Sequence, residues 1–137
     1  MKPWEHLVQY YETDQMGIVH HSNYIRWMEE ARTFFLREVG LSYRAMEEAG
    51  ILIPVLGVNC TYHSMVRFED TVEINPKLIS YNGVKLELSY EIRDQKTGEL
   101  RASGESRHCF LTSERRPLSL KRSHPGLHQK FMELLEG

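Results

Sequence analysis

Apolar positions along the chain recur with two different periods, which separate a helical segment from a set of extended ones. The apolar or small side chains of residues 24–39 are spaced three or four positions apart, at Tyr24, Met28, Ala31, Phe35 and Val39. This spacing places them on one face of a helix. Ser22 or Asn23 is a suitable N-cap, and Gly40 is a suitable stop just beyond the end. The pattern therefore predicts one long amphipathic helix over residues 24–39.

Most of the remaining chain alternates with a period of two, which is typical of strands. The alternation is clearest over residues 84–93, where one face carries Val84, Leu86, Leu88, Tyr90 and Ile92. Asn82 and Gly83, just before this segment, form a strong hairpin signal. Further extended segments are predicted at residues 5–11, 51–67, 71–81 and 99–112, and short helices at residues 43–49 and 124–135.

The order of these elements predicts a single α+β domain over residues 1–137. Strands joined by hairpins form an antiparallel sheet. One face of that sheet is apolar, and the helix over residues 24–39 is the long amphipathic element available to cover it. A sheet of few strands with one helical cover leaves open edges, so we expect two copies of the chain to pair.

Composition narrows the class of protein further. Of the 137 residues, 41% are hydrophobic and 26% are charged, and the net charge of −2 argues against a strongly basic nucleic-acid binder. The longest apolar run, residues 51–58, is interrupted by Pro54 and Gly57 and is too short for a membrane span. The first residues lack the apolar core of a signal peptide. Cys60 and Cys109 have no metal-type spacing, so we expect two thiols in a cytoplasmic protein.

The loop before the long helix holds the candidate chemistry. It brings a carboxylate (Asp14), two imidazoles (His20 and His21) and a flexible glycine (Gly17) close to a helix N-terminus. The first N–H groups of a helix have no internal partner and can bind a carbonyl oxygen that becomes negative. A carboxylate beside that carbonyl can attack it or activate water, which is the logic of acyl transfer.

The same loop also allows a purely structural interpretation, whereas the sequence gives little support to a metal site or a serine nucleophile. An Asp next to a glycine is commonly a turn residue whose side chain bonds its own backbone. The histidines lack the spacing of a metal site, so no metal or cofactor is predicted. A nucleophilic serine would need a Gly-x-Ser-x-Gly turn, which the sequence does not contain.

The same loop resembles a known family. Tyr-Glu-Thr-Asp (residues 11–14), Gly-Ile-Val (17–19) and His-His-Ser-Asn-Tyr (20–24), followed by Glu-Ala-Arg (30–32) in the helix, look like the 4-hydroxybenzoyl-CoA thioesterase family, and more narrowly like its YbgC-type acyl-CoA thioesterases. The resemblance covers about Trp4 to Leu120. It implies the hotdog fold, a curved antiparallel sheet wrapped around a long central helix in the order β-α-β-β-β-β. One departure is that the family commonly has a further acidic residue before the threonine of the motif.

The resemblance also implies roles for four residues of the loop. Asp14 takes the position of the catalytic aspartate, as nucleophile or general base. His21 matches a histidine that orients water or the thioester. Tyr24 matches the tyrosine at the helix start, whose backbone N–H polarises the thioester carbonyl and whose ring lines the pocket. Tyr11 matches the aromatic residue upstream in the motif.

Substrate and partners follow from the same resemblance. It implies an acyl-CoA substrate contacted by Gly17, Ile18 and Val19, with basic residues near the CoA phosphates, for which Arg67 and Arg116 are the candidates. It also implies a homodimer or homotetramer with active sites at the subunit interface. No nucleic acid, membrane span or metal is expected.

The predicted function is hydrolysis of acyl-CoA to a carboxylic acid and CoA. Two alternatives remain open, namely an acyl-carrier-protein thioesterase that uses the same chemistry, and a non-catalytic hotdog module that binds acyl-CoA. The sequence does not choose between a nucleophilic and a general-base aspartate. It also leaves open the acyl-chain preference, the pathway, and the choice between dimer and tetramer.

Overall fold

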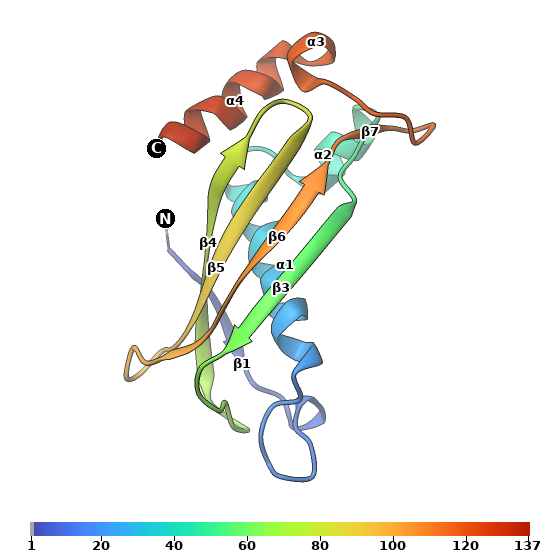
Figure 1. Ribbon diagram of the computed structural model, residues 1–137. Helices are drawn as coiled ribbons and strands as arrows, with labels where there is room; N and C mark the ends of the chain where they lie inside the picture. Colours follow the sequence, from blue (N-terminus) through green and yellow to red (C-terminus); the bar gives the residue numbers. More distant parts are fainter. Residues whose placement is uncertain (1) are drawn as a thin grey trace. The chain divides into compact units, whose positions relative to one another are not determined.

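The computed structural model describes residues 2–137 and is α+β (Figure 1). Its main sheet has five strands in the order β1-β4-β5-β6-β3, with bounds β1 Trp4–Leu7, β3 Val55–Tyr62, β4 Thr71–Tyr81, β5 Lys85–Asp94 and β6 Leu100–Cys109. A second, two-stranded sheet pairs β2 (Ile51–Leu52) with β7 (Leu111–Thr112). The helices are η1 Tyr10–Glu12, α1 Ser22–Glu38, α2 Tyr43–Glu48, α3 Leu120–Ser123 and α4 Pro125–Glu136.

Tight turns make the main sheet antiparallel, as the hairpin signals predict. The turn between β4 and β5 is built on Asn82, whose Oδ1 accepts hydrogen bonds from the Val84 and Lys85 N–H groups at 2.9 and 2.8 Å. Gly83 follows with φ +89°, a conformation that favours glycine. Asp94 closes the next turn by accepting the Thr97 N–H at 2.9 Å. At one edge β1 pairs antiparallel with β4, and β3 forms the opposite edge.

The chain divides into two compact units. Unit 1 comprises residues up to Phe35 together with Asn59–Pro76 and Tyr90–Gly104, and unit 2 comprises Leu36–Val58, Lys77–Ser89 and Glu105–Gly137. Helix α1 and four strands contribute residues to both. Buried apolar side chains occur in both units.

In unit 1, α1 packs on the sheet through its apolar face. Trp27, Met28 and Ala31 are at most 1% exposed. A Cβ at Gly104 of β6 would collide with the backbone carbonyl of Asn59 in β3 and would lie 2.7 Å from the Met28 Cε atom, so the glycine permits the close approach of the β3 backbone and of the helix side chain. Arg32, also buried in α1, donates a hydrogen bond to the Tyr90 hydroxyl of β5 at 3.0 Å. The predicted cover of the sheet by this helix is therefore present within unit 1.

In unit 2, α4 is held by aromatic packing. Phe131 is fully buried and stacks on Tyr81 of β4, with ring centroids 4.9 Å apart, while Phe110 meets it edge-on at 5.6 Å. The Tyr81 hydroxyl also lies 2.8 Å from Nδ1 of His128. Burial raises the pKa of Tyr81 to about 12, so this phenol is neutral at ordinary pH.

The structure corrects several predicted boundaries. The first strand ends at Leu7 rather than at residue 11, because Tyr10–Glu12 close a 3-10 turn in which Glu12 accepts the Gln9 N–H. The long helix begins at Ser22 and ends at Glu38, two residues and one residue earlier than predicted. Two further elements, α3 and the β2–β7 sheet, were not foreseen as separate elements, since runs this short carry no clear period.

Candidate active site

The loop before α1 is a small hairpin that carries Asp14 at its turn. Thr13 and Val19 form an antiparallel bridge, and the Asp14 N–H donates to the Ile18 carbonyl at 2.8 Å. The Gly17 N–H closes the turn on the Asp14 carbonyl at 3.0 Å, with Gly17 at φ +76°. The flexible glycine of the motif is therefore needed for the turn itself.

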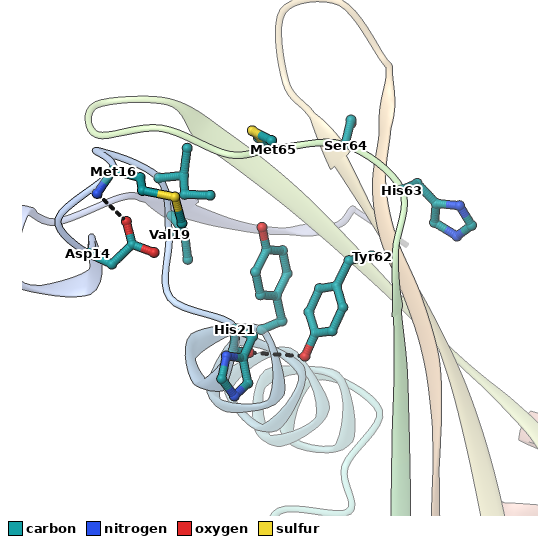
Figure 2. Close-up of a pocket in the computed structure, with 10 residues that line it drawn as sticks. Asp14, Met16, Val19, His21, Tyr62, His63, Ser64 and Met65 are labelled. Atoms are coloured by element: carbon teal, nitrogen blue, oxygen red, sulfur yellow. Dashed lines mark hydrogen bonds between the residues drawn. The ribbon is translucent and has the colours of Figure 1, made fainter.

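The Asp14 carboxylate has two different surroundings. Its Oδ1 accepts the Met16 N–H at 2.8 Å, which is the turn interaction expected of an Asp beside a glycine. Its other oxygen is directed toward the pocket that Asp14 lines (Figure 2). Asp14 can therefore be a turn residue and a pocket residue at the same time, because each role uses a different carboxylate oxygen.

The pocket lies in unit 1 and has a volume of about 450 Å³. One side is formed by the hairpin and the start of α1, and the other by the chain that leaves β3. It is lined by Asp14, Met16, Ile18, Val19, His21, Tyr24, Tyr62, His63, Ser64 and Met65. The two sides are joined by the Val19 N–H, which donates to the Val66 carbonyl at 2.8 Å. Mostly apolar walls with a few polar groups are typical of a site for a small organic ligand.

The N–H groups at the start of α1 are engaged to different degrees. The Ser22 N–H donates to Nδ1 of His20 at 3.2 Å, and the Asn23 N–H to the His20 carbonyl at 3.0 Å. The Tyr24 N–H points to the His21 carbonyl at 3.4 Å, which is longer than a usual N–H···O bond. Of these three amides, that of Tyr24 is held least tightly. This is the amide that the family resemblance pairs with the thioester carbonyl, and that role remains a prediction.

Two aromatic rings form the wall beside the helix start. Tyr24 is 4% exposed, and Tyr62 meets it edge-on with ring centroids 4.9 Å apart. Burial raises the pKa of Tyr24, so its hydroxyl is a neutral group at ordinary pH. The Tyr62 hydroxyl donates to the His21 carbonyl at 3.2 Å and ties β3 to the helix start (Figure 2).

His21 lines the pocket, whereas His20 does not. Nδ1 of His20 lies 2.9 Å from the Ser22 Oγ, so this ring hydrogen-bonds to the first residue of α1. The His21 ring lies next to it, with centroids 4.2 Å apart and the ring planes tilted by 30°, and it is exposed to solvent. Between the two histidines, the one implied by the family motif is therefore the one beside the pocket.

The other predicted site residues fall in different places. Ile18 and Val19 line the pocket, while Gly17 serves the turn. Arg67 is exposed and forms a bridge with Ile18, which places it next to the pocket wall. Tyr11 is 82% exposed and is not among the lining residues.

Arg116 belongs to unit 2. It is exposed, and its N–H donates to the Thr112 Oγ1 at 3.1 Å in the turn after β7. The roles assigned to Tyr11 and Arg116 remain predictions.

Sequence reasoning missed one whole wall of the pocket. Residues 62–65 comprise the last residue of β3 and the three that follow it, and they carry no recognisable motif. Only the sheet brings them opposite a loop about 40 to 50 positions earlier in the chain. No pattern within this segment could have found them, because their role depends on a long-range contact.

Comparison with known proteins identifies the family. A family model described as the thioesterase-like superfamily matches residues 8–133. The chain is 35% identical over 125 residues to YneP of Bacillus subtilis (strain 168), named as a candidate acyl-CoA thioesterase, with 90% of each chain covered. It is 30% identical over 89 residues to the acyl-CoA thioester hydrolase YbgC of Escherichia coli O157:H7, covering 65% of this chain and 66% of the relative. A DHNA-CoA thioesterase from Staphylococcus aureus superposes with a TM-score of 0.92 at 29% identity, covering 98% of this chain and 91% of the other.

The chain therefore belongs to the thioesterase-like superfamily. The resemblance drawn from the loop motif is confirmed, and so is the predicted hotdog fold. With them the class of enzyme is established as a thioesterase. Among residues 2–137, no group of three or more His, Cys, Asp or Glu side chains could hold a metal ion, and no helix is long and apolar enough to cross a membrane.

Proposed function

We propose that the protein is an acyl-CoA thioesterase, which converts acyl-CoA and water into a carboxylic acid and CoA. The activities named for YneP and YbgC support this substrate class. A largely apolar pocket of about 450 Å³ suits an acyl group. The reaction needs water, a carboxylate and a donor for the carbonyl oxygen, so no cofactor is invoked.

The main observation behind the proposal is that the two oxygens of the Asp14 carboxylate have different surroundings. One oxygen is held by the Met16 N–H, which orients the group, and the other is directed into the pocket. That oxygen either attacks the thioester carbon or takes a proton from a water that attacks it. In both routes the carbon–sulfur bond breaks, one oxygen from water enters the acid, and CoA leaves as a thiol.

The remaining polar groups fit around this reaction. The loosely held Tyr24 N–H is the donor we assign to the thioester oxygen as it gains negative charge. His21, exposed at the pocket wall, orients the attacking water or the thioester. Arg67 beside the pocket is the first candidate for the CoA phosphates, and Arg116 remains a second.

The test is Asp14→Asn with thiol release followed by Ellman's reagent. An amide oxygen at this position can still accept the Met16 N–H, so we expect the fold to persist and kcat to fall about 100-fold or more. Asp70→Asn is the matched control, because Asp70 also accepts a backbone N–H, that of Arg67 at 2.9 Å, but does not line the pocket. Wild-type kcat in Asp14→Asn would contradict the proposal.

Thiol release from two kinds of thioester, together with calorimetry, separates two alternatives. An acyl-carrier-protein thioesterase would hydrolyse acyl-carrier-protein thioesters faster than matched acyl-CoAs. A non-catalytic binding module would bind acyl-CoA in calorimetry without releasing thiol. The pocket-facing Asp14 oxygen favours an enzyme, since a pure binder has no use for a carboxylate next to an electrophilic carbonyl.

We further propose that two copies of the chain associate along β3, in a dimer or tetramer whose active sites lie at the subunit interface. As an edge strand, β3 exposes Val55, Leu56 and Val58, each between 43% and 51%. An apolar exposed edge favours pairing with another strand. Met65, 59% exposed, leaves the rim of the pocket open for a second copy to cover.

We also propose a cytoplasmic location. The free thiols of Cys60 and Cys109 suit a reducing compartment.

A further inference from the structure

A buried carboxylate lies just before the hairpin that carries Asp14, and it does not line the pocket. Glu12 is 4% exposed, and its carboxylate accepts three hydrogen bonds inside the protein. Its Oε1 accepts from the Gln9 N–H and from Nε2 of His6, each at 2.8 Å, and its Oε2 accepts from Nε1 of Trp27 at 2.8 Å. Hydrogen bonds to a buried carboxylate are short and strong, so this group joins β1, η1 and α1 within unit 1.

The backbone of the same residue holds the ends of the hairpin together. The Glu12 carbonyl accepts the His20 N–H at 2.8 Å and Nδ2 of Asn23 at 2.9 Å. Glu12 and His20 flank the segment 13–19, whose turn presents Asp14 to the pocket. The side chain of Glu12 thus fixes one end of the hairpin to the helix, and its carbonyl fixes the other.

The charge state of Glu12 suits this role. Burial raises its pKa, but the hydrogen bonds from Gln9, His6 and Trp27 outweigh that effect and leave the pKa below its usual value. The carboxylate is therefore ionised at neutral pH and accepts from all three donors at once. Nδ1 of His6 faces a second carboxylate, Glu30 of α1, at 3.2 Å, and Nε1 of Trp4 donates to Glu30 at 3.0 Å.

We propose that Glu12 is a positioning residue for the hydrolysis, one that sets the place of the Asp14 carboxylate relative to the start of α1. The role rests on the proposed function of Asp14. Reacting groups have to be held to a fraction of an ångström, and a shift of about 1 Å can cost about 100-fold in rate. Glu12 supplies this precision because it is the point at which strand, helix and hairpin are tied together.

The test compares Glu12→Gln with Glu30→Gln by steady-state kinetics on acyl-CoA. An amide at position 12 offers one acceptor oxygen and turns an NH2 group toward a donor, so at least one of the three hydrogen bonds is lost. We expect kcat to fall about tenfold to 100-fold with KM changed less than about twofold. Glu30→Gln alters a carboxylate whose hydrogen bonds go to His6 and Trp4, so it should keep kcat within about twofold of the wild type.

Hydrogen exchange separates positioning from general loosening. In Glu12→Gln we expect faster exchange over residues 13–20 and unchanged exchange over β5, whereas a merely structural role would speed exchange throughout unit 1. If Glu12→Gln does not fold, Trp27→Phe removes one donor while keeping Glu12, and the same fall in kcat with constant KM is expected.

Three results would overturn the inference. They are wild-type kcat in the folded variant, a rise in KM that accounts for the whole loss of kcat/KM, and an equal effect of Glu30→Gln. Asp14→Asn is measured alongside. If it is inactive while Glu12→Gln is fully active, only the positioning role fails. If Asp14→Asn keeps wild-type kcat, the proposed function fails and the positioning role fails with it.

Discussion

Replacing Gly17 by alanine tests whether the hairpin must hold its shape for catalysis. Gly17 has φ +76° in the turn that presents Asp14, and a Cβ added there would meet no atom within 4 Å. The substitution therefore introduces no clash. Its effect arises from the backbone conformation alone.

The magnitude follows from two opposing contributions. A left-handed conformation costs an L-residue roughly 1–2 kcal/mol. Alanine also lowers the conformational entropy of the unfolded chain, which stabilises the folded state by about 0.4–1 kcal/mol. The net loss of stability is about 1 kcal/mol, which for a chain of 137 residues lowers Tm by about 3 °C. The same strain acts on the balance between the closed hairpin and a locally opened one, and about 1 kcal/mol changes that equilibrium constant about fivefold toward the open form.

Gly98 supplies a matched control in the turn between β5 and β6. It also has φ +76°, and a Cβ there would likewise meet nothing within 4 Å. We expect Gly17→Ala and Gly98→Ala to lower Tm by similar amounts in thermal denaturation. In the thiol-release assay, kcat should fall about twofold to fivefold in Gly17→Ala and stay unchanged in Gly98→Ala. Equal kcat values in the two variants would refute the link between hairpin shape and catalysis.

Two further predictions concern stability and assembly. The pKa of Tyr81 is raised to about 12 from an ordinary value of 10.0, so its contribution to stability is present below pH 10 and is lost as the pH rises toward 12. Tyr81→Phe should flatten that alkaline loss in urea unfolding measured across pH, and an unchanged slope would contradict the assignment. Val58→Lys places a charge on the exposed β3 edge and should shift the protein toward monomers in analytical ultracentrifugation. A wild-type chain that sediments as a monomer would refute the pairing.

Local patterns predicted much of the fold. The spacing of apolar side chains placed the long helix to within two residues, because one buried face imposes its period on the sequence. The turn chemistry of Asn82 and Gly83 predicted the β4–β5 hairpin. Alternation also assigned four side chains of β5 correctly to the buried face, while Val84 lies outside the strand and is 38% exposed.

The end of the first strand was predicted wrongly because a side-chain hydrogen bond sets it. Tyr10 and Tyr11 have strong β propensity, yet they lie exposed in a 3-10 turn. Glu12 reaches back to the Gln9 N–H there, which ends the strand. Propensity is weaker than a buried, charge-assisted hydrogen bond, and such a bond cannot be read from the pattern of apolar positions.

The sequence by itself determined the candidate loop and the family it resembles, and it predicted Asp14 as the reactive group, because these depend on residue types within a few positions of one another. Tertiary structure alone decided which Asp14 oxygen faces the pocket, which wall stands opposite it, and which buried carboxylate ties the hairpin to the helix. The physical reason is that burial and hydrogen-bond pairing arise between segments distant in the chain. Tyr62 and Trp27 acquire their roles only when the sheet and helix bring them beside the loop.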